Sequence, residues 1–288
     1  MKCTLCPRKC NIDRSTNVGF CGSKSTVKLA LCNLHFSEEP IISGTNGSGT
    51  VFFCGCNLKC VYCQNYEVSR NTIGKEISVQ RLAKIFKELE EQGAHNINLV
   101  TPTHYANAII EALNIYKPNI PIVYNTNGYE SAETIEKLKD YVDIYLTDFK
   151  YFSNDLAAKY SSASNYCEMA TSALKQMLQN QPNNIIENGL MKKGVVVRHL
   201  VLPNNTDDSI NVLNHINQNF GNNVLISLMS QYVPLNNLEN YPEINRPLKP
   251  IEYKLVLNHL NKLGFDGFMQ ELSSNSTSYI PKFDGTGV

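Results

Sequence analysis

Four cysteines lie close together between residues 54 and 63, and three of them, Cys56, Cys60 and Cys63, have the spacing C-x3-C-x2-C. Tyr62 directly precedes the third cysteine. A structural zinc site needs four ligands, and Cys54 is available as the fourth. However, Cys54 and Cys56 are separated by one residue and would form a cramped chelate. The spacing therefore favours a [4Fe-4S] cluster held by three thiolates, with one iron left open for a substrate or cofactor.

A second group of cysteines has the spacing C-x2-C-x3-C-x10-C and consists of Cys3, Cys6, Cys10 and Cys21. Four thiolates suffice for tetrahedral zinc or for a second iron–sulfur cluster, and the spacing is compatible with both. We favour a closed structural site, with zinc ahead of iron–sulfur, and buried thiols without metal are the alternative. Cys32 and Cys167 stand apart, and Cys167 is interpreted as a small apolar residue within a helix.

The composition excludes several classes of protein. Of the 288 residues, 42% are hydrophobic and 18% are charged, with a net charge of zero, so no nucleic acid is expected as a partner. No apolar run approaches the ~18 residues that would suggest a membrane span. The first ten residues lack the apolar stretch of a signal peptide, and we expect a cytoplasmic protein without membrane attachment. Cytosolic thiols stay reduced, which favours metal binding over disulfides.

The elements that must position these cysteines follow from an alternation of β-branched runs and amphipathic stretches. Strands are predicted at 50–53, 96–100, 121–125, 142–147, 194–202 and 224–229. Helices are predicted at 78–93, 104–116, 131–140, 154–180, 206–219 and 250–263, with a loop near residue 186. Strands regularly separated by helices imply right-handed crossovers and a parallel sheet.

Six strand–helix units are too few for a complete eight-unit barrel, so we predict an α/β fold with a partial (β/α)6 barrel at 50–270. A small cysteine-rich metal-binding segment and its connection would occupy 1–49, and a tail would occupy 271–288. The polar motifs that follow the predicted strands are the cysteine loop, TPTH (101–104), NTNG (125–128), TDFK (147–150) and SQY (230–232). The carboxyl ends of parallel strands share one edge, which predicts an active site there, although loops are often polar for no functional reason.

The cysteine motif, with an aromatic residue before its third cysteine and a place in the loop after the first strand, resembles the hallmark of the radical S-adenosylmethionine (SAM) superfamily. Other stretches resemble proteins related to the pyruvate formate-lyase activating enzyme, of the PflX-like branch: EEPIISGTNGSGTVFF, CVYCQNYEVS, NLVTPTHY, VYNTNGY, DIYLTDFKY, RHLVLPN and SLMSQYVP. The resemblance spans nearly the whole chain. It implies a partial (β/α)6 barrel, a [4Fe-4S] cluster on Cys56, Cys60 and Cys63, and Cys54 as a non-ligand.

The resemblance also implies a reaction. The amino and carboxylate groups of SAM would chelate the open iron, and an electron from the reduced cluster would break the 5′ carbon–sulfur bond. The resulting 5′-deoxyadenosyl radical takes hydrogen from an unactivated C–H, so the protein must position the reactants and exclude water and oxygen. A flavodoxin or ferredoxin would supply the electron.

Further site residues follow from the resemblance by position. Asp148 and Lys150 occupy the place of an aspartate and lysine that serve the cofactor region, and we list Lys150 as a catalytic candidate; a surface ion pair is the alternative. Tyr62 is expected along the adenine or in packing. Arg198 is a candidate partner of the methionine carboxylate or the ribose, with His199 facing the opposite way. Gln231 stands where relatives often place a histidine near the cofactor.

Two loops depart from the relatives. Asn125, Thr126 and Asn127 replace the DTN sequence of the activase, so a carboxylate that helps to bind a cation is missing, although the two asparagines remain cofactor-binding candidates. A glycine-glycine-glutamate motif is replaced by TPTH, in which Thr101 and Thr103 offer oxygens for the methionine amino group. In the same motif His104 is either a proton donor, and hence a catalytic candidate, or the start of the next helix.

Two classes of function follow. The leading hypothesis is a radical SAM enzyme that abstracts hydrogen, either from a glycine of a partner glycyl-radical enzyme or from a small molecule or peptide. The alternative is a metal-binding interaction or redox-sensing module that turns over no substrate. Formation of 5′-deoxyadenosine distinguishes the two classes.

Overall fold

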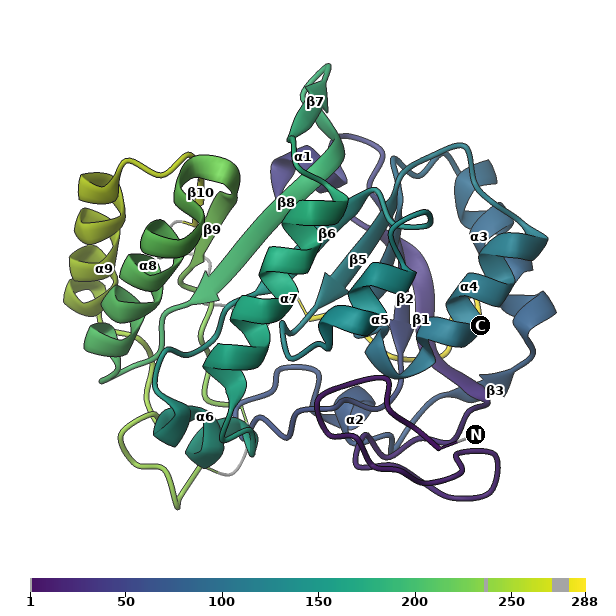
Figure 1. Ribbon diagram of the computed structural model, residues 1–288, viewed down its shortest axis with the longest axis horizontal. Helices are drawn as coiled ribbons and strands as arrows, with labels where there is room; N and C mark the ends of the chain where they lie inside the picture. The colour runs from purple at the N-terminus through teal and green to yellow at the C-terminus, as the bar shows by residue number, and fades with distance from the viewer. Residues whose placement is uncertain (1, 236–237, 271–279) are drawn as a thin grey trace.

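A mostly parallel sheet forms the centre of the protein, which we describe from a computed structural model covering residues 2–235, 238–270 and 280–288. The strands follow the order β10-β9-β8-β6-β5-β4-β2-β1-β3, and β7 pairs with β8 (Figure 1). The neighbouring strands from β10 to β2 in this order are parallel, whereas β1 runs antiparallel to β2 and β3, and β7 runs antiparallel to β8. The strands are β1 Val27–His35, β2 Ser48–Phe53, β3 Lys75–Ile77, β4 Ile97–Val100, β5 Ile122–Thr126, β6 Ile144–Asp148, β7 Ile185–Glu187, β8 Leu190–Leu200, β9 Leu225–Met229 and β10 Gly267–Met269.

Helices connect the parallel strands, and local sequence signals set their ends. The Ser78 hydroxyl caps α3 by accepting a hydrogen bond from Arg81 N at 3.1 Å. Pro250 opens α9, and Gly264, in a left-handed conformation, closes it. The helices are α1 Pro40–Ser43, α2 Tyr66–Ser69, α3 Val79–Glu91, α4 Ala106–Ile115, α5 Ala132–Lys137, α6 Asn154–Ser161, α7 Tyr166–Asn180, α8 Thr206–Phe220 and α9 Pro250–Leu263, with short 3-10 turns η1 Thr103–Tyr105 and η2 Gly221–Asn223.

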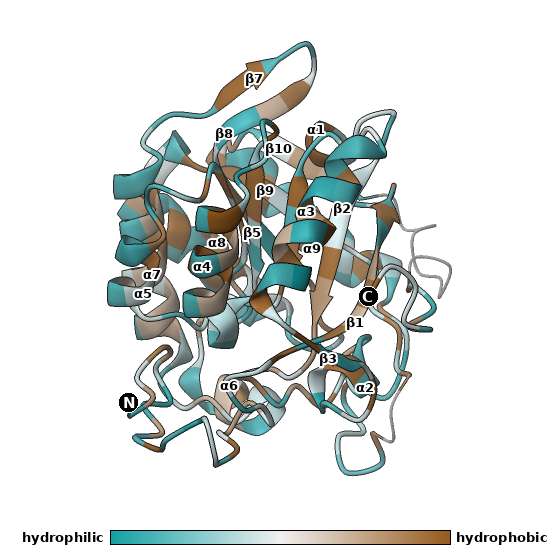
Figure 2. Ribbon diagram, turned by 90° about the vertical axis from the view of Figure 1, so that its right-hand side faces the viewer, coloured by the Kyte–Doolittle hydropathy of each residue, from teal (hydrophilic) through white to brown (hydrophobic). Residues whose placement is uncertain are grey.

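The sheet is buried on both faces. Helices α4, α5, α7 and α8 cover one face, and α1 lies on the other (Figures 1 and 2). On the α1 side, Ile41 and Ile42 pack against Val123 and Ile144, which lie near the amino ends of β5 and β6. This packing fills the concave face at the amino ends of the strands and leaves the carboxyl ends for polar side chains. The predicted α/β partial barrel with an N-terminal cysteine segment is therefore confirmed.

Several predicted elements need correction. The helix predicted at 154–180 is two helices, because Ser162 takes a left-handed conformation (φ 56°) after α6. The segment near residue 186 was expected to be a loop but forms the β7 to β8 hairpin. Strands β1, β3 and β10 were not predicted, because they are edge strands or lie outside the regular alternation.

The ends of the chain join the same sheet. Strand β1 precedes the boundary predicted at residue 50 and pairs with β2. Part of the predicted tail, 271–279, lies outside the described residues. The rest packs along β1, where Gly285 N donates to Ala30 O at 3.1 Å and Cys32 N donates to Thr286 O at 2.9 Å. The division into 1–49, 50–270 and 271–288 stays a prediction. Within the described ranges, no helix has the length and apolar character needed to cross a membrane.

Candidate active site

A cavity of about 240 Å³ opens at the carboxyl edge of the parallel strands. Its lining comes from the loops after β2, β4, β5 and β9, from the ends of β6 and β8, and from the segment between β1 and α1. The residues predicted from the sequence that line it are Cys56, Cys60, Tyr62, Cys63, Thr101, Asn125, Asn127, Asp148, Lys150, Arg198 and Gln231. The structure thus brings most of the candidates together at one cavity, and their individual roles stay predictions.

The cysteine loop is held tightly at its start. Gly55 has φ +91°, and a Cβ atom there would lie 2.6 Å from the carbonyl oxygen of Cys21, so only glycine fits. Cys56 N donates to the same carbonyl oxygen at 3.1 Å. The N-terminal segment therefore packs directly against the loop that carries the three cavity cysteines.

Cys54 differs from the three cysteines that follow it. Its Sγ donates to the carbonyl oxygen of Ile73 at 3.3 Å, and its side chain packs with Phe52 and Val68 in a separate apolar cluster. It does not line the cavity. Burial raises the pKa of the Cys54 thiol to about 11, as expected for a neutral packing residue. This placement agrees with the prediction that Cys54 is not a cluster ligand.

The three cavity thiols share one space. In the described parts of the chain, the N-terminal cysteines included, no three His, Cys, Asp or Glu side chains are grouped closely enough to hold one metal ion. Cys56, Cys60 and Cys63 nevertheless face one cavity, and a cubane cluster is larger than a single ion. Burial, followed by the neighbouring Cys60 thiol, raises the pKa of Cys56 to about 12. Cluster binding would therefore have to displace protons from the thiols.

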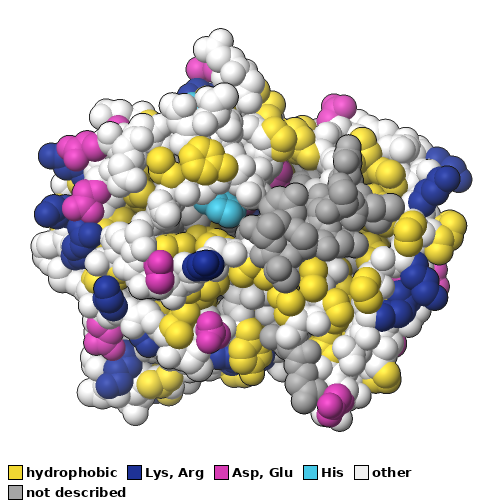
Figure 3. Space-filling view, turned by 180° about the vertical axis from the view of Figure 1, so that it is seen from behind, with side chains coloured by type: hydrophobic (Ala, Val, Ile, Leu, Met, Phe, Trp, Pro, Cys, Tyr) yellow, Lys and Arg dark blue, Asp and Glu magenta, His cyan; other side chains and the backbone are white. Residues whose placement is uncertain are grey.

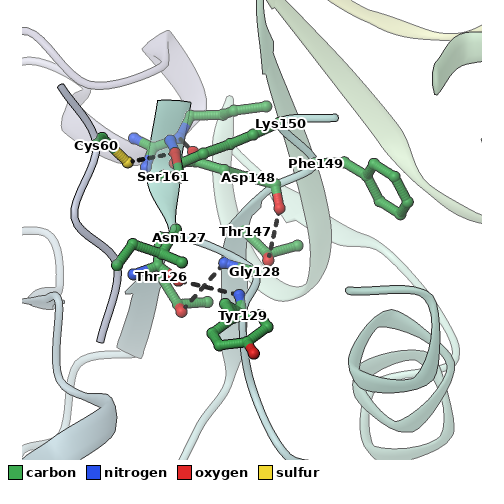
Figure 4. Close-up of polar contacts among 12 residues, drawn as sticks. Cys60, Thr126, Asn127, Gly128, Tyr129, Thr147, Asp148, Phe149, Lys150 and Ser161 are labelled. Carbon is green, nitrogen blue, oxygen red and sulfur yellow. Dashed lines mark hydrogen bonds and ion pairs between the residues drawn. The ribbon is translucent and has the colours of Figure 1, made fainter. Parts of the chain in front are cut away.

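A buried network of charges lies in the cavity wall beside Cys60 (Figure 4). Lys150 Nζ lies 2.6 Å from Asp148 Oδ2, and Arg198 Nε donates to Asp148 Oδ1 at 2.9 Å. Arg198 Nη2 also donates to Asn125 Oδ1 at 2.6 Å. Burial opposes ionisation of Asp148, but the charges of Lys150 and Arg198 outweigh it and lower the pKa of this carboxyl. Asp148 and Lys150 thus form a buried cavity pair, and the surface ion pair that the sequence left open is wrong.

Glu38 completes this network and was not among the predicted site residues. It accepts hydrogen bonds from Asn98 Nδ2 at 3.0 Å and Asn125 Nδ2 at 3.3 Å, and its other oxygen lies 3.4 Å from Arg198 Nη1. Glu38 comes from the segment just before α1 and lines the cavity. Burial raises its pKa even though Arg198 acts to lower it. Arg198 is consequently engaged by two carboxylates of the protein itself.

The remaining cavity candidates have defined neighbours. The ring of Tyr62 is buried and tilted against Tyr232, and its hydroxyl lies 2.5 Å from that of Tyr151. Gln231 is held through its carbonyl oxygen, which accepts from Gln64 Nε2 at 2.6 Å. Thr101 takes a left-handed conformation (φ 57°) at the cavity edge, which places it in a sterically costly turn.

His104 and Thr103 do not line the cavity. His104 is buried in η1, where its Nε2 is 2.8 Å from the carbonyl oxygen of Cys54. Burial lowers its pKa to about 3, so it stays neutral at physiological pH. His104 lies in the short helical turn that precedes α4, which is the second of the two interpretations given for it above. Its place outside the cavity lining gives no support to a role as proton donor. His199 also faces away from the cavity, with Nδ1 2.7 Å from Phe149 O, as expected from its neighbour Arg198.

A second residue missed by the sequence is Glu130. The hydroxyls of Thr103 and Thr126 both donate to its Oε1, while Oε2 is buried without a hydrogen-bond partner. Burial raises the pKa of Glu130 to about 7. The carboxyl therefore ties the TPTH loop to the NTNG loop behind the cavity. Neither Glu38 nor Glu130 lies in a motif at the carboxyl end of a strand, and only the EEP stretch of the resemblance pointed toward Glu38.

The N-terminal cysteines lie beside the cluster loop. Cys6 and Cys21 are buried, whereas Cys3 and Cys10 are partly exposed. A Cβ atom at Gly19 would lie 3.4 Å from Cys21 Sγ and 3.8 Å from Cys10 Sγ, so these two thiols border the same small space. Burial raises the pKa of Cys6 to about 12, and the charges of Glu130, Cys21 and Cys10 act in the same direction. The thiols of Cys6, Cys10 and Cys21 are thus close enough to influence one another.

The face opposite the main helices carries mixed charges. Figure 3 shows lysine, arginine and acidic side chains interspersed toward its sides, with hydrophobic side chains scattered between them. This distribution agrees with the net charge of zero.

Comparisons with known proteins point to one family. The model of the family described as "Radical SAM superfamily" matches residues 50–216 of this chain. An uncharacterized protein of Methanocaldococcus jannaschii, MJ0674, is 33% identical over 274 residues, which cover 92% of this chain and 75% of that protein. The pyruvate formate-lyase-activating enzyme of Clostridium pasteurianum is 24% identical over 240 residues, which cover 79% of this chain and 90% of the enzyme.

Two solved structures share the fold. Streptococcus suis SuiB bound to precursor peptide SuiA has a TM-score of 0.50 at 13% identity, over 75% of this chain and 46% of SuiB. A radical SAM methyltransferase from Sphaerobacter thermophilus has a TM-score of 0.50 at 14% identity, over 77% of this chain and 65% of the methyltransferase. The chain therefore spans less than half of SuiB and about two thirds of the methyltransferase.

Proposed function

Because the chain belongs to the radical SAM superfamily, we propose that it cleaves SAM reductively and abstracts a hydrogen atom from a peptide or protein segment, such as a glycine of a partner glycyl-radical enzyme. The observation that carries this proposal is the cavity whose lining combines Cys56, Cys60 and Cys63 with Asp148 and Lys150. When bound by the three cysteines, a [4Fe-4S] cluster supplies the electron for cleavage of SAM.

The residues of this chain do the positioning. Asp148 and Lys150 present an anion and a cation in the same cavity lining as the cysteines, and Arg198 holds Asp148 in place. Such fixed charges orient the polar groups of a bound cofactor without reorganisation at the moment of reaction. Tyr62 and Gln231 add polar atoms to the same lining. The likeness to pyruvate formate-lyase-activating enzymes supports a protein substrate.

A small-molecule substrate is the second candidate. Glu38, Arg198, Asp148 and Lys150 concentrate charge in the cavity, which suits recognition of a compact polar molecule. A peptide backbone would instead require uncharged hydrogen-bonding groups along an extended groove.

The first experiment tests catalysis. The protein is reconstituted anaerobically with iron and sulfide, reduced, and mixed with SAM, and 5′-deoxyadenosine is quantified with Cys60→Ala as the control. Formation of 5′-deoxyadenosine by the wild type but not by Cys60→Ala supports the proposal of a radical SAM enzyme. A reducible cluster that neither binds nor cleaves SAM would favour a redox-sensing module.

The second experiment tests the substrate. The reduced enzyme and SAM are mixed with glycyl-radical enzymes of the host, and a glycyl doublet is sought by electron paramagnetic resonance. A doublet supports the activase. Its absence with every candidate, together with deuterium transfer into 5′-deoxyadenosine from a labelled metabolite, would establish the small-molecule alternative and leave the radical chemistry intact.

We further propose that a flavodoxin or ferredoxin docks beside the cluster loop. Lys59 lies in this loop, and its pKa is lowered by burial and then by the charge of Arg70, so cations gather here. Arg8 and Lys59 both lie against the partly exposed ring of Phe20. Opposite charges steer association of an acidic donor. Lys59→Glu should slow reduction by flavodoxin several-fold but not by dithionite, whereas Lys84→Glu on α3 should change neither.

For the N-terminal cysteines we propose a structural metal site, with zinc favoured over a second iron–sulfur cluster. The proximity of the Cys10 and Cys21 thiols and the packing of this segment against Gly55 support it, and binding would have to draw the other two thiols closer, since the described residues hold no ready group of three metal ligands. Metal analysis of protein purified from zinc-supplemented and iron-supplemented cultures distinguishes the two metals.

A further inference from the structure

Two side chains outside the cysteine loop donate hydrogen bonds to the sulfur atoms of cluster cysteines. Ser161 Oγ, at the end of α6, donates to Cys60 Sγ at 2.9 Å (Figure 4). Asn127 Nδ2 donates to Cys56 Sγ at 3.2 Å. Ser161 is 101 residues from Cys60 in the sequence and fully buried, so its contact with the sulfur is a product of the fold.

The backbone holds Ser161 in register with Cys60. Lys59 N, just before Cys60, donates to the carbonyl oxygen of Ser161 at 3.1 Å. Val61 N, just after Cys60, donates to the carbonyl oxygen of Tyr160 at 2.8 Å. The end of α6 is therefore hydrogen-bonded to the cysteine loop on both sides of Cys60. These two hydrogen bonds fix the distance between the Ser161 hydroxyl and the Cys60 sulfur.

The Ser161 hydroxyl is the last member of a buried chain of hydroxyl groups. Tyr151 Oη lies 2.7 Å from Ser161 Oγ, and Tyr62 Oη lies 2.5 Å from Tyr151 Oη. Tyr62 lines the cavity and directly follows Val61 in the cysteine loop. The chain thus runs from the cavity wall, through Tyr151, to the sulfur of Cys60.

The number of protons sets the direction of this chain when Cys60 is a cluster-bound thiolate. A thiolate has no proton, and Ser161 has one, so Ser161 must donate to the sulfur. Tyr151 must then donate to Ser161, and Tyr62 to Tyr151. All three O–H dipoles point toward the sulfur, and each strengthens the next.

We propose that Ser161, with Tyr151 and Tyr62 behind it, is a positioning residue that raises the reduction potential of the cluster. The reduced cluster carries one more negative charge than the oxidised cluster, and part of that charge lies on the ligating sulfurs. A hydrogen-bond donor at a sulfur stabilises the reduced state more strongly and so raises the potential. The inference rests on the cluster and not on the identity of the substrate.

The test is a redox titration of the reconstituted protein without SAM or substrate, followed by electron paramagnetic resonance. Ser161→Ala should shift the midpoint potential to a more negative value. Tyr151→Phe keeps the serine but removes its donor, and should shift the potential in the same direction by a smaller amount. Iron content and Mössbauer spectra establish that each variant holds the same cluster.

Tyr160→Phe is the matched control. Tyr160 precedes Ser161 in α6 and is buried. Its hydroxyl donates to Glu243 Oε1 at 2.7 Å and takes no part in the row of hydroxyl groups formed by Tyr62, Tyr151 and Ser161. Its loss should leave the potential unchanged. An intact cluster with the wild-type potential in Ser161→Ala overturns the proposal. If Ser161→Ala does not assemble a cluster, Tyr151→Phe decides the question by the same criterion. Failure to find a substrate would leave this result unaffected.

Discussion

The carboxylate of Asp148 lies 2.6 Å from the ammonium group of Lys150, two residues farther along the chain, and the two side chains are only 12% and 16% exposed. The other oxygen of Asp148 accepts a hydrogen bond from Arg198. One anion therefore balances two cations in the cavity wall, with Glu38 contributing a second anion at longer distance. This arrangement makes Asp148 the central member of the network.

The first prediction concerns this network. Asp148→Ala should lower the free energy of unfolding by about 3 kcal/mol, because it leaves the largely buried Lys150 without its partner and Arg198 with the more distant carboxylate of Glu38. Chemical denaturation of the protein measures the change. Lys139→Ala, which breaks an exposed ion pair with Glu136, should leave stability essentially unchanged. If both substitutions lowered the free energy of unfolding equally, Asp148 would not be the central member of the buried network.

The second prediction separates the cluster ligands from their neighbour. Alanine at Cys56, Cys60 or Cys63 should abolish the cavity cluster, whereas Cys54→Ala should leave it assembled. Cys54 packs in a different apolar cluster and does not line the cavity. Iron content and Mössbauer spectra of the four variants measure the outcome. Loss of the cluster in Cys54→Ala would refute the three-ligand assignment.

The third prediction concerns the N-terminal cysteines. A segment that binds structural metal derives folding energy from it, so Cys3→Ala combined with Cys6→Ala should lower the melting temperature by at least about 5 °C. Some SAM cleavage should remain. Cys167→Ala changes a single half-buried cysteine of α7 and should lower the melting temperature by less than the double variant does. A double variant that stays folded and keeps its cavity cluster, yet cannot cleave SAM with a strong reductant, would show that this site takes part in the chemistry.

The fourth prediction is a pH dependence of stability. Burial raises the pKa of Glu130 from 4.5 to about 7, so between these values the folded state keeps a proton that the unfolded state has released. The contribution of this proton to the free energy of unfolding is fully present below about pH 4.5. It is lost as the pH rises to about 7, which lowers the free energy of unfolding by roughly 3 kcal/mol in total. Glu130→Gln should remove this pH dependence.

The measurement is the difference in unfolding free energy between Glu130→Gln and the wild type from pH 5 to pH 8. The difference is needed because His104 and His199, whose pKa values burial lowers, contribute the opposite slope below about pH 6.5. Exposed Glu133, changed to glutamine, should give a curve parallel to that of the wild type. A constant difference between Glu130→Gln and the wild type would mean that Glu130 is ionised throughout this range.

The sequence by itself determined the features that depend on local spacing. The C-x3-C-x2-C motif marked Cys56, Cys60 and Cys63, and the alternation of strands and helices predicted the partial barrel. From these two facts the carboxyl edge of the sheet followed as the site, because parallel strands must end together. The side to which Arg198 points also followed, from the two-residue period of a strand.

Only the tertiary structure decided which side chains meet across long separations in the chain. Glu38 contacts Arg198 from 160 residues away, and Ser161 contacts Cys60 from 101 residues away. It also decided that His104 lies buried beneath the cysteine loop and not in the cavity, although it belongs to a motif at a strand end. Periodicity specifies which face of an element a residue occupies, but the packing of whole elements sets how far a side chain reaches and which partner satisfies its polar atoms.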